Sequence, residues 1–150
     1  MKTKIQKEYM DLGFGFPLYL QNVPMVYVRG VWTPNVNYKR LSEMVFQMFV
    51  EKPSRLTGNE LKFIRNKLQM TLKAFAERFY VTHPAVLKWE KSADKPTNMS
   101  WATEKDIRLY VYQYLSKEDN FSDIYEQLEK PPSSTPRKTK IDFEKTVILV

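Results

Sequence analysis

A chain of 150 residues is long enough for one ordinary domain or two small ones, and its 43% hydrophobic content is sufficient for a packed core. The absence of cysteine and the single histidine exclude disulfides and thiolate sites and argue against a histidine-rich metal centre, so we expect no cofactor and no metal. We see neither an apolar run of membrane-spanning length nor a secretory signal, and we expect a cytoplasmic protein without a membrane partner. The net charge of +7 permits a polyanionic partner without identifying one, and solubility alone is the alternative meaning of this charge.

Residues 1–52 predict a small α+β unit. A polar start and a Gly-Phe-Gly-Phe turn lead into two short strand-like runs, 17–20 and 25–28, that are rich in β-branched and aromatic residues. A helix is expected from Tyr38 to about Val50, because apolar residues recur there at three- and four-residue steps. About fifty residues are marginal for independent stability, so we expect this unit to pack on the rest of the chain or to dimerise.

Residues 53–128 predict an all-helical domain. Thr57 and Glu60 have the spacing of a capping box and begin one helix. Thr71 and Thr82 are suitable N-caps for two short helices, and Ser100 for a long one.

Residues 129–150 predict a linker and a terminal strand. The stretch 131–140 is rich in Pro, Ser and Lys, which is typical of disordered linkers. The run 141–150 is too apolar for a free tail, and we expect it to add a strand to a sheet, either in cis or on a partner protomer.

The stretch 71–90 has the pattern of a helix-turn-helix. Two short helices that cross steeply need a small residue in the first, and Ala76 supplies it. Val81 fills the turn, and Val86 anchors the second helix to the core. Pro84 falls in the first turn of that helix, where its missing N–H is not needed.

This spacing resembles the Xre-type, lambda-repressor-like helix-turn-helix family from about Leu56 to Leu115. The resemblance rests on Phe75-Ala76, Val81-Thr82, Val86 and Lys88-Trp89-Glu90 together. The family usually has glycine at the turn, where the backbone is left-handed, and this chain has Tyr80. A left-handed tyrosine costs roughly 1 kcal/mol or more, so we expect either a slightly different turn or packing of the ring to offset the strain.

The resemblance implies that the helix 82–90 enters the major groove of double-stranded DNA. Lys88 would donate to guanine edges or to a phosphate, and Pro84 would contact at most a thymine methyl. Thr71 and Lys73 fit phosphate contacts at a helix N-terminus, with Arg65 and Lys67 as weaker candidates. The predicted DNA-binding residues are Thr71, Lys73, Thr82, His83, Pro84, Leu87 and Lys88. For Lys88 the structural alternative is a solvated surface lysine.

The layout also resembles two-domain antitoxins of the MqsA type, in which a small α+β domain precedes this kind of helix-turn-helix. Their first domain usually holds zinc through two Cys pairs, and this chain has no cysteine. If the relationship holds, packing of aromatic residues between Phe14 and Trp32 replaces the metal. The resemblance implies a cognate toxin as a possible partner.

The leading hypothesis is a sequence-specific DNA-binding transcriptional regulator, antitoxin-like and repressing its own gene. A homodimer is expected, because one short helix reads too few bases for useful specificity. The alternative is a protein-interaction module that keeps the helix-turn-helix as a scaffold and neutralises a partner, which Pro84 and Leu87 on the reading face favour. An enzyme is not expected, because no catalytic motif is found.

Overall fold

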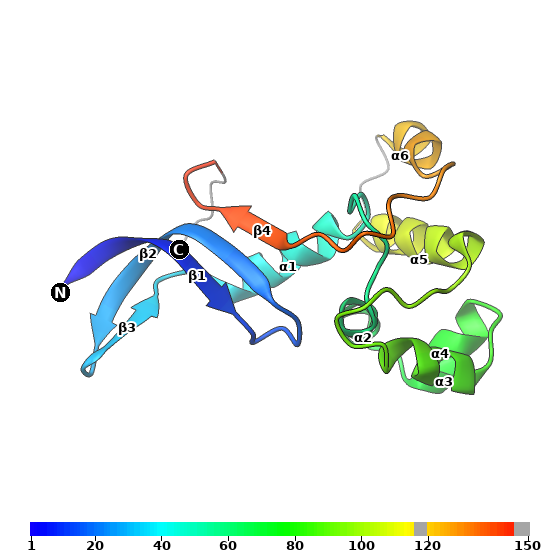
Figure 1. Ribbon diagram of the computed structural model, residues 1–150, viewed down its shortest axis with the longest axis horizontal. Helices are drawn as coiled ribbons and strands as arrows, with labels where there is room; N and C mark the ends of the chain where they lie inside the picture. The colour runs from blue at the N-terminus through cyan, green and yellow to red at the C-terminus, as the bar shows by residue number, and fades with distance from the viewer. Residues whose placement is uncertain (116–119, 146–150) are drawn as a thin grey trace. The chain divides into compact units, whose positions relative to one another are not determined.

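The computed structural model describes residues 1–115 and 120–145, and over these it combines a four-stranded sheet with six helices (Figure 1). The mixed α and β content was predicted, and so was a strand region near the N-terminus. The elements in chain order are β1 Thr3–Asp11, β2 Leu18–Val28, β3 Val31–Pro34, α1 Tyr38–Met48, α2 Gly58–Lys67, α3 Leu72–Arg78, α4 His83–Glu90, α5 Trp101–Tyr114, α6 Phe121–Gln127 and β4 Thr139–Asp142.

The chain divides into two compact units. The sheet unit comprises Met1–Met44 and Lys138–Val150, and the helical unit comprises Val45–Arg137. This division differs from the predicted segments 1–52, 53–128 and 129–150, because the end of α1 groups with the helices and the last strand joins the first unit. In the helical unit, for example, the ring of Phe46 lies 5.7 Å from that of Tyr114.

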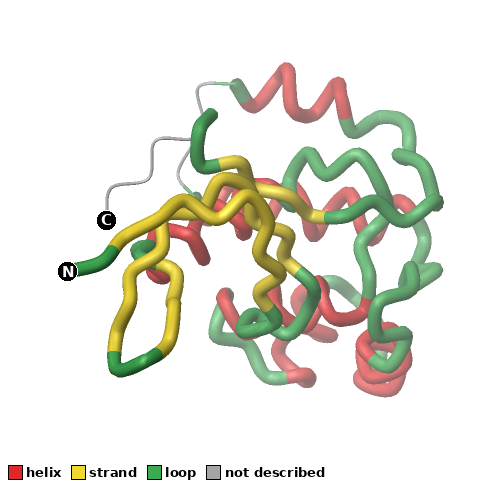
Figure 2. Tube along the Cα trace, turned by 60° about the vertical axis from the view of Figure 1, so that its left-hand side comes forward, coloured by secondary structure: helices red, strands yellow, loops and turns green. Residues whose placement is uncertain are grey.

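Strand β2 is the centre of the sheet (Figure 2). Strand β1 pairs antiparallel along it, β3 pairs antiparallel with its last residues, and β4 pairs parallel with its first. The prediction of two separate runs at 17–20 and 25–28 was wrong, because residues 21–24 continue the same strand. The polar start of the chain forms strand β1, which was not predicted and most of whose side chains are exposed.

The C-terminal segment returns to the sheet in cis. Residues Thr139–Asp142 form β4, with Thr139 opposite Leu18 and Ile141 opposite Leu20. Asn22 Nδ2 donates to Asp142 Oδ1 at 3.0 Å, and this bond, with one from the Glu144 N–H, lowers the pKa of Asp142. The predicted terminal strand at 141–150 therefore begins earlier, and its last five residues lie outside the described part of the chain.

The predicted linker 131–140 contains ordered contacts. The Arg55 N–H donates to the Ser133 carbonyl at 2.9 Å, and Ser54 forms a parallel bridge with Ser133. Residues 139 and 140 belong to β4. The prediction of disorder was wrong for these positions, because backbone hydrogen bonds that composition does not reveal fix them.

Helices α2, α3, α4 and α5 begin at the positions that their predicted N-cap residues indicated. Thr57 and Glu60 form a complete capping box, and Ser100 caps α5. Helix α6 was not predicted, and its C-terminal end is tied to α5 by the Trp101 indole N–H, which donates to the Leu128 carbonyl at 2.9 Å. The core of this unit is apolar and fully buried, and it includes Leu56, Leu61, Ile64, Phe75, Val86, Ile107 and Val111.

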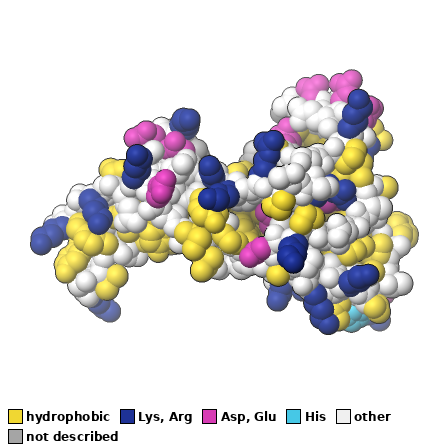
Figure 3. Space-filling view, in the orientation of Figure 1, with side chains coloured by type: hydrophobic (Ala, Val, Ile, Leu, Met, Phe, Trp, Pro, Cys, Tyr) yellow, Lys and Arg dark blue, Asp and Glu magenta, His cyan; other side chains and the backbone are white. Residues whose placement is uncertain are grey.

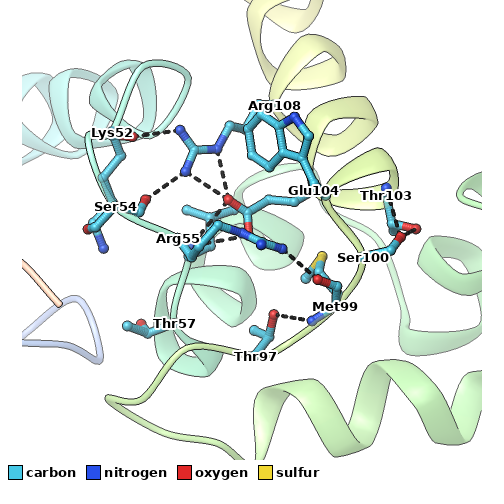
Figure 4. A network of polar contacts seen from close by, with 12 residues as sticks. Lys52, Ser54, Arg55, Thr57, Thr97, Met99, Ser100, Thr103, Glu104 and Arg108 are labelled. Carbon is cyan, nitrogen blue, oxygen red and sulfur yellow. Dashed lines mark hydrogen bonds and ion pairs between the residues drawn. The ribbon is translucent and has the colours of Figure 1, made fainter. Parts of the chain in front are cut away.

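A buried polar network anchors α5 to the segment that precedes α2 (Figure 4). Glu104, which is fully buried, accepts from Arg55 Nε at 2.9 Å and from Arg108 Nη2 at 2.8 Å. Arg108 also donates to the Lys52 and Ser54 carbonyls, at 2.8 and 2.7 Å. Burial lowers the pKa of Arg108, and the Glu104 carboxylate opposes that shift. The network satisfies otherwise unpaired carbonyls and one buried carboxylate.

Among the described helices, none combines the length and the apolar character that a membrane-spanning helix requires.

Candidate nucleic-acid interface

Helix α4 is held against α2 by a close backbone approach and a fork-shaped ion pair. Gly58, the first residue of α2, lies so near the C-terminal end of α4 that a Cβ there would fall 2.7 Å from the Glu90 carbonyl oxygen and 2.6 Å from Ser92 Oγ. Arg65 donates to both carboxylate oxygens of Glu90, from Nε at 2.6 Å and from Nη2 at 3.0 Å. These contacts fix which face of α4 is turned to the core.

The turn between α3 and α4 closes with a Schellman motif. The Val81 N–H donates to the Ala76 carbonyl at 3.0 Å, and the Tyr80 N–H to that of Glu77 at 3.4 Å. The motif requires a left-handed residue, and Tyr80 has φ +57°. The turn is therefore left-handed, as expected for the position where the family that the sequence resembles usually has glycine. The expectation that ring packing offsets the strain was wrong, because the Tyr80 side chain is 91% exposed.

The two threonines predicted to contact DNA cap the helices. Thr71 Oγ1 accepts from the Ala74 N–H at 3.0 Å, and Thr82 Oγ1 accepts from the Ala85 N–H at 3.2 Å. Both residues are exposed at helix N-termini. The oxygen of each is thus committed to the cap, and the hydroxyl hydrogen is what each can offer to an acceptor outside the chain.

The exposed face of α4 carries four of the predicted residues. His83 and Leu87 lie one turn apart, as do Pro84 and Lys88, and all four are exposed. On the opposite side Val86 is fully buried, as predicted, while Trp89 is half-buried. Figure 3 shows Lys and Arg side chains beside the single histidine at the end of the molecule where α3 and α4 lie.

The remaining basic candidates have different environments. Lys73 is exposed in the first turn of α3. The assignment of Arg65 as a weaker candidate for phosphate contact was wrong. Its guanidinium is mostly buried and binds Glu90 and, at 3.0 Å, the Met70 carbonyl. Lys67 is half-buried in the last turn of α2. Sequence reasoning assigned Arg65 from charge alone and missed its partner, which lies 25 residues away.

The electrostatics of this region favour an anion. Glu90, the acidic residue within α4, is neutralised by Arg65, which leaves Lys88 as the exposed charge of that helix besides any charge on His83. Lys91 follows directly and is exposed. Glu77 is the exposed acidic residue of α3, and it lies one turn after Lys73 on the same side of that helix. In residues 1–115 and 120–145, no group of three His, Asp or Glu side chains is arranged to hold a metal ion.

Comparisons with known proteins returned no match for this chain among protein-family models, curated proteins or solved structures.

Proposed function

We propose that this protein is a sequence-specific DNA-binding transcriptional regulator that reads the major groove with α4. The observation that carries the proposal is the exposed face formed by His83, Pro84, Leu87 and Lys88 on a helix whose opposite side is locked to the core. A helix held in this way can enter a groove without losing its own packing. The Xre-type resemblance supports the same assignment.

Within this proposal the side chains have distinct roles. Lys88 donates to a guanine edge or a phosphate, His83 hydrogen-bonds a base or backbone oxygen, and Leu87 and Pro84 contact thymine methyl groups. Lys73, the N-terminal amides of α3 and the Thr71 hydroxyl bind phosphate and set the register of the helix in the groove. Thr82 positions the start of α4 as its cap.

The assembly and the cellular setting are also proposals. One α4 helix contacts few base pairs, so we propose a homodimer that binds two half-sites about one helical turn apart. We propose a cytoplasmic protein that represses its own gene, with a toxin as a possible further partner. Sedimentation of the protein with and without a two-site duplex measures the stoichiometry, and one protomer per duplex would contradict the dimer.

The primary test is a salt titration of binding to the DNA immediately upstream of the protein's own coding sequence, against a scrambled duplex. We expect binding to the upstream DNA to persist at moderate salt and binding to the scramble to be weak and salt-sensitive. Equal and steeply salt-dependent binding to both duplexes, or no binding, contradicts sequence reading by α4.

Two variants assign the contacts. Lys88→Ala should weaken specific binding by about 1–3 kcal/mol. Lys73→Ala should weaken binding to the upstream and scrambled duplexes alike, and should reduce the slope of log affinity against log salt concentration by about 0.9. Lys39→Ala removes the same charge from an exposed position of α1 in the sheet unit and is the control. Unchanged affinity in Lys88→Ala would favour a protein-interaction role for this face, which co-purification with a partner protein would then test.

A further inference from the structure

The sheet unit, which does not contain α4, carries a cationic surface with two partly exposed aromatic rings. Its residues are Lys2, Lys4, Tyr27, Arg29 and Trp32, called here the hairpin surface. Lys2, Lys4 and Arg29 are exposed, Tyr27 is 40% exposed and Trp32 is half-buried. The segments that supply them, 1–7 and 22–40, contain no Asp or Glu.

Strand register places the rings and the lysines on one face. Tyr27 is opposite Trp32 across the β2–β3 hairpin, and their rings lie 5.2 Å apart at an interplanar angle of 60°. On the other side of β2, the Tyr27 N–H donates to the Lys2 carbonyl at 3.0 Å. Lys2 Nζ lies 5.5 Å from the Tyr27 ring centroid, and Lys4 Nζ lies 4.5 Å from that of Trp32.

The hairpin turn adds a third cation at a strained position. Arg29 and Gly30 form the two-residue connection between β2 and β3, with φ +50° and +83°. Such turns favour Asn or Gly at the first position, and an arginine there costs of the order of 1 kcal/mol. Despite this cost, the turn has an arginine, whose guanidinium is at the exposed tip of the hairpin. Figure 3 shows Lys and Arg side chains around hydrophobic ones at this end of the sheet unit.

We propose that the hairpin surface binds single-stranded nucleic acid. Cations bind the phosphodiester backbone, and exposed aromatic rings stack on bases, which is the combination that holds unpaired strands. Each lysine Nζ lies over a ring, so the phosphate ligand and the stacking surface are adjacent, and a base that stacks on the ring displaces the lysine toward the backbone phosphate. Duplex DNA satisfies the cations but not the rings, because its bases are already stacked on one another.

The test measures binding of the full-length protein to a labelled oligothymidylate of about 12 nucleotides, which cannot pair with itself. We expect binding to quench the fluorescence of Trp32, and the change to disappear in Trp32→Phe, which keeps Trp89 and Trp101. Quenching of Trp32 by a duplex of equal length that is as strong as quenching by the oligomer, or quenching that persists in Trp32→Phe, overturns the proposal.

Two kinds of variant separate stacking from charge. Trp32→Leu should lower the affinity for the oligomer about tenfold at an unchanged salt slope. Lys2→Ala with Lys4→Ala should reduce the slope by about 0.7 for each phosphate contact that is lost. The control double variant, Lys140→Ala with Lys145→Ala, removes the same charge from exposed positions of the same unit. If it weakens binding as much as the Lys2 and Lys4 variant does, net charge explains the effect and the proposal fails.

This site is independent of the proposed reading helix. Lys88→Ala should leave the oligothymidylate affinity unchanged, and Trp32→Leu should leave binding to the upstream duplex unchanged. The two measurements therefore show separately whether the hairpin surface or the reading helix fails its test. Denaturant midpoints of all variants should match that of the parent chain, because the substituted side chains are outside the core. If Trp32→Leu does not fold, Tyr27→Leu replaces it in the stacking measurement.

Discussion

Arg65 and Glu90 join α2 to α4 through two parallel hydrogen bonds of 2.6 and 3.0 Å, with side chains that are 12% and 8% exposed. Removal of one partner leaves the other charge largely buried and unpaired. We expect Arg65→Ala to reduce the free energy of unfolding by about 3 kcal/mol. Lys62→Ala, at an exposed position of the same helix, should change it by less than about 0.5 kcal/mol. Urea denaturation of both variants measures the difference, and equal midpoints would contradict a structural role for Arg65.

Glu104 is the acceptor on which two arginines converge. In Glu104→Ala the guanidiniums of Arg55 and Arg108 keep carbonyl acceptors and the Trp101 ring but lose their carboxylate, and we expect a loss of about 3–5 kcal/mol of stability. Glu77→Ala, on the exposed face of α3, is the matched control and should be nearly neutral. Calorimetric unfolding distinguishes the two, and a Glu104 variant as stable as the control would show that the network contributes little.

Gly58 should resist substitution by alanine although it lies in a helix. Alanine ordinarily stabilises a helix by about 1 kcal/mol relative to glycine. Here the new Cβ meets the Trp89 and Glu90 carbonyl oxygens, so α2 and α4 must move apart. We expect Gly58→Ala to lower the denaturant midpoint and to weaken DNA binding with it. A midpoint above that of the parent chain would contradict the close approach.

Tyr80 offers a test of backbone strain without a change in packing. Because its ring is almost fully exposed, truncation to alanine removes little burial, and alanine and glycine variants differ mainly in their tolerance of φ +57°. We expect Tyr80→Gly to be more stable than Tyr80→Ala by about 1 kcal/mol. Thermal unfolding of the pair provides the measurement. The reverse order would mean that the turn is not left-handed in solution.

Tyr38 should make stability fall at high pH. Burial first, and then the charge of Asp11, raise the pKa of Tyr38 from 10.0 to about 12. The folded state therefore keeps this proton after the unfolded chain has lost its own, so the contribution is complete below pH 10 and is lost as the pH rises toward 12. Tyr38→Phe should flatten the decline over that interval, and Tyr80→Phe, at an exposed ring, should not. Equal pH profiles for the two variants would exclude this origin.

Local sequence signals predicted the parts of the fold that local chemistry decides. Thr57, Thr71, Thr82 and Ser100 cap helices as expected, because the side chain and the amides it binds lie within three residues. Strand β1 gave no such signal, since an edge strand with both faces mostly in water need not alternate. The continuity of β2 through residues 21–24 is set by its pairing with β1, which no short window of sequence contains.

The candidate interface shows the same boundary between local and distant effects. Exposure of His83, Pro84, Leu87 and Lys88 follows from helical periodicity once Val86 is placed in the core. The role of Arg65 depends on Glu90 in another helix, and charge alone does not reveal it. Glu104 and Arg108 have the i, i+4 spacing of a surface ion pair, and only their burial under Val50, Lys52 and Ser54 makes them a core network.

The parallel pairing of β4 with β2 imposes an order on biosynthesis. Leu18 and Leu20 leave the ribosome before any of the six described helices, whereas their partners Thr139 and Ile141 follow all six. Until then the edge of β2 that will receive β4 has unpaired amides and carbonyls, which invite pairing with a foreign strand. The helices can fold before the last strand of the sheet has been synthesised, and nascent chains are most exposed to mispairing during that interval.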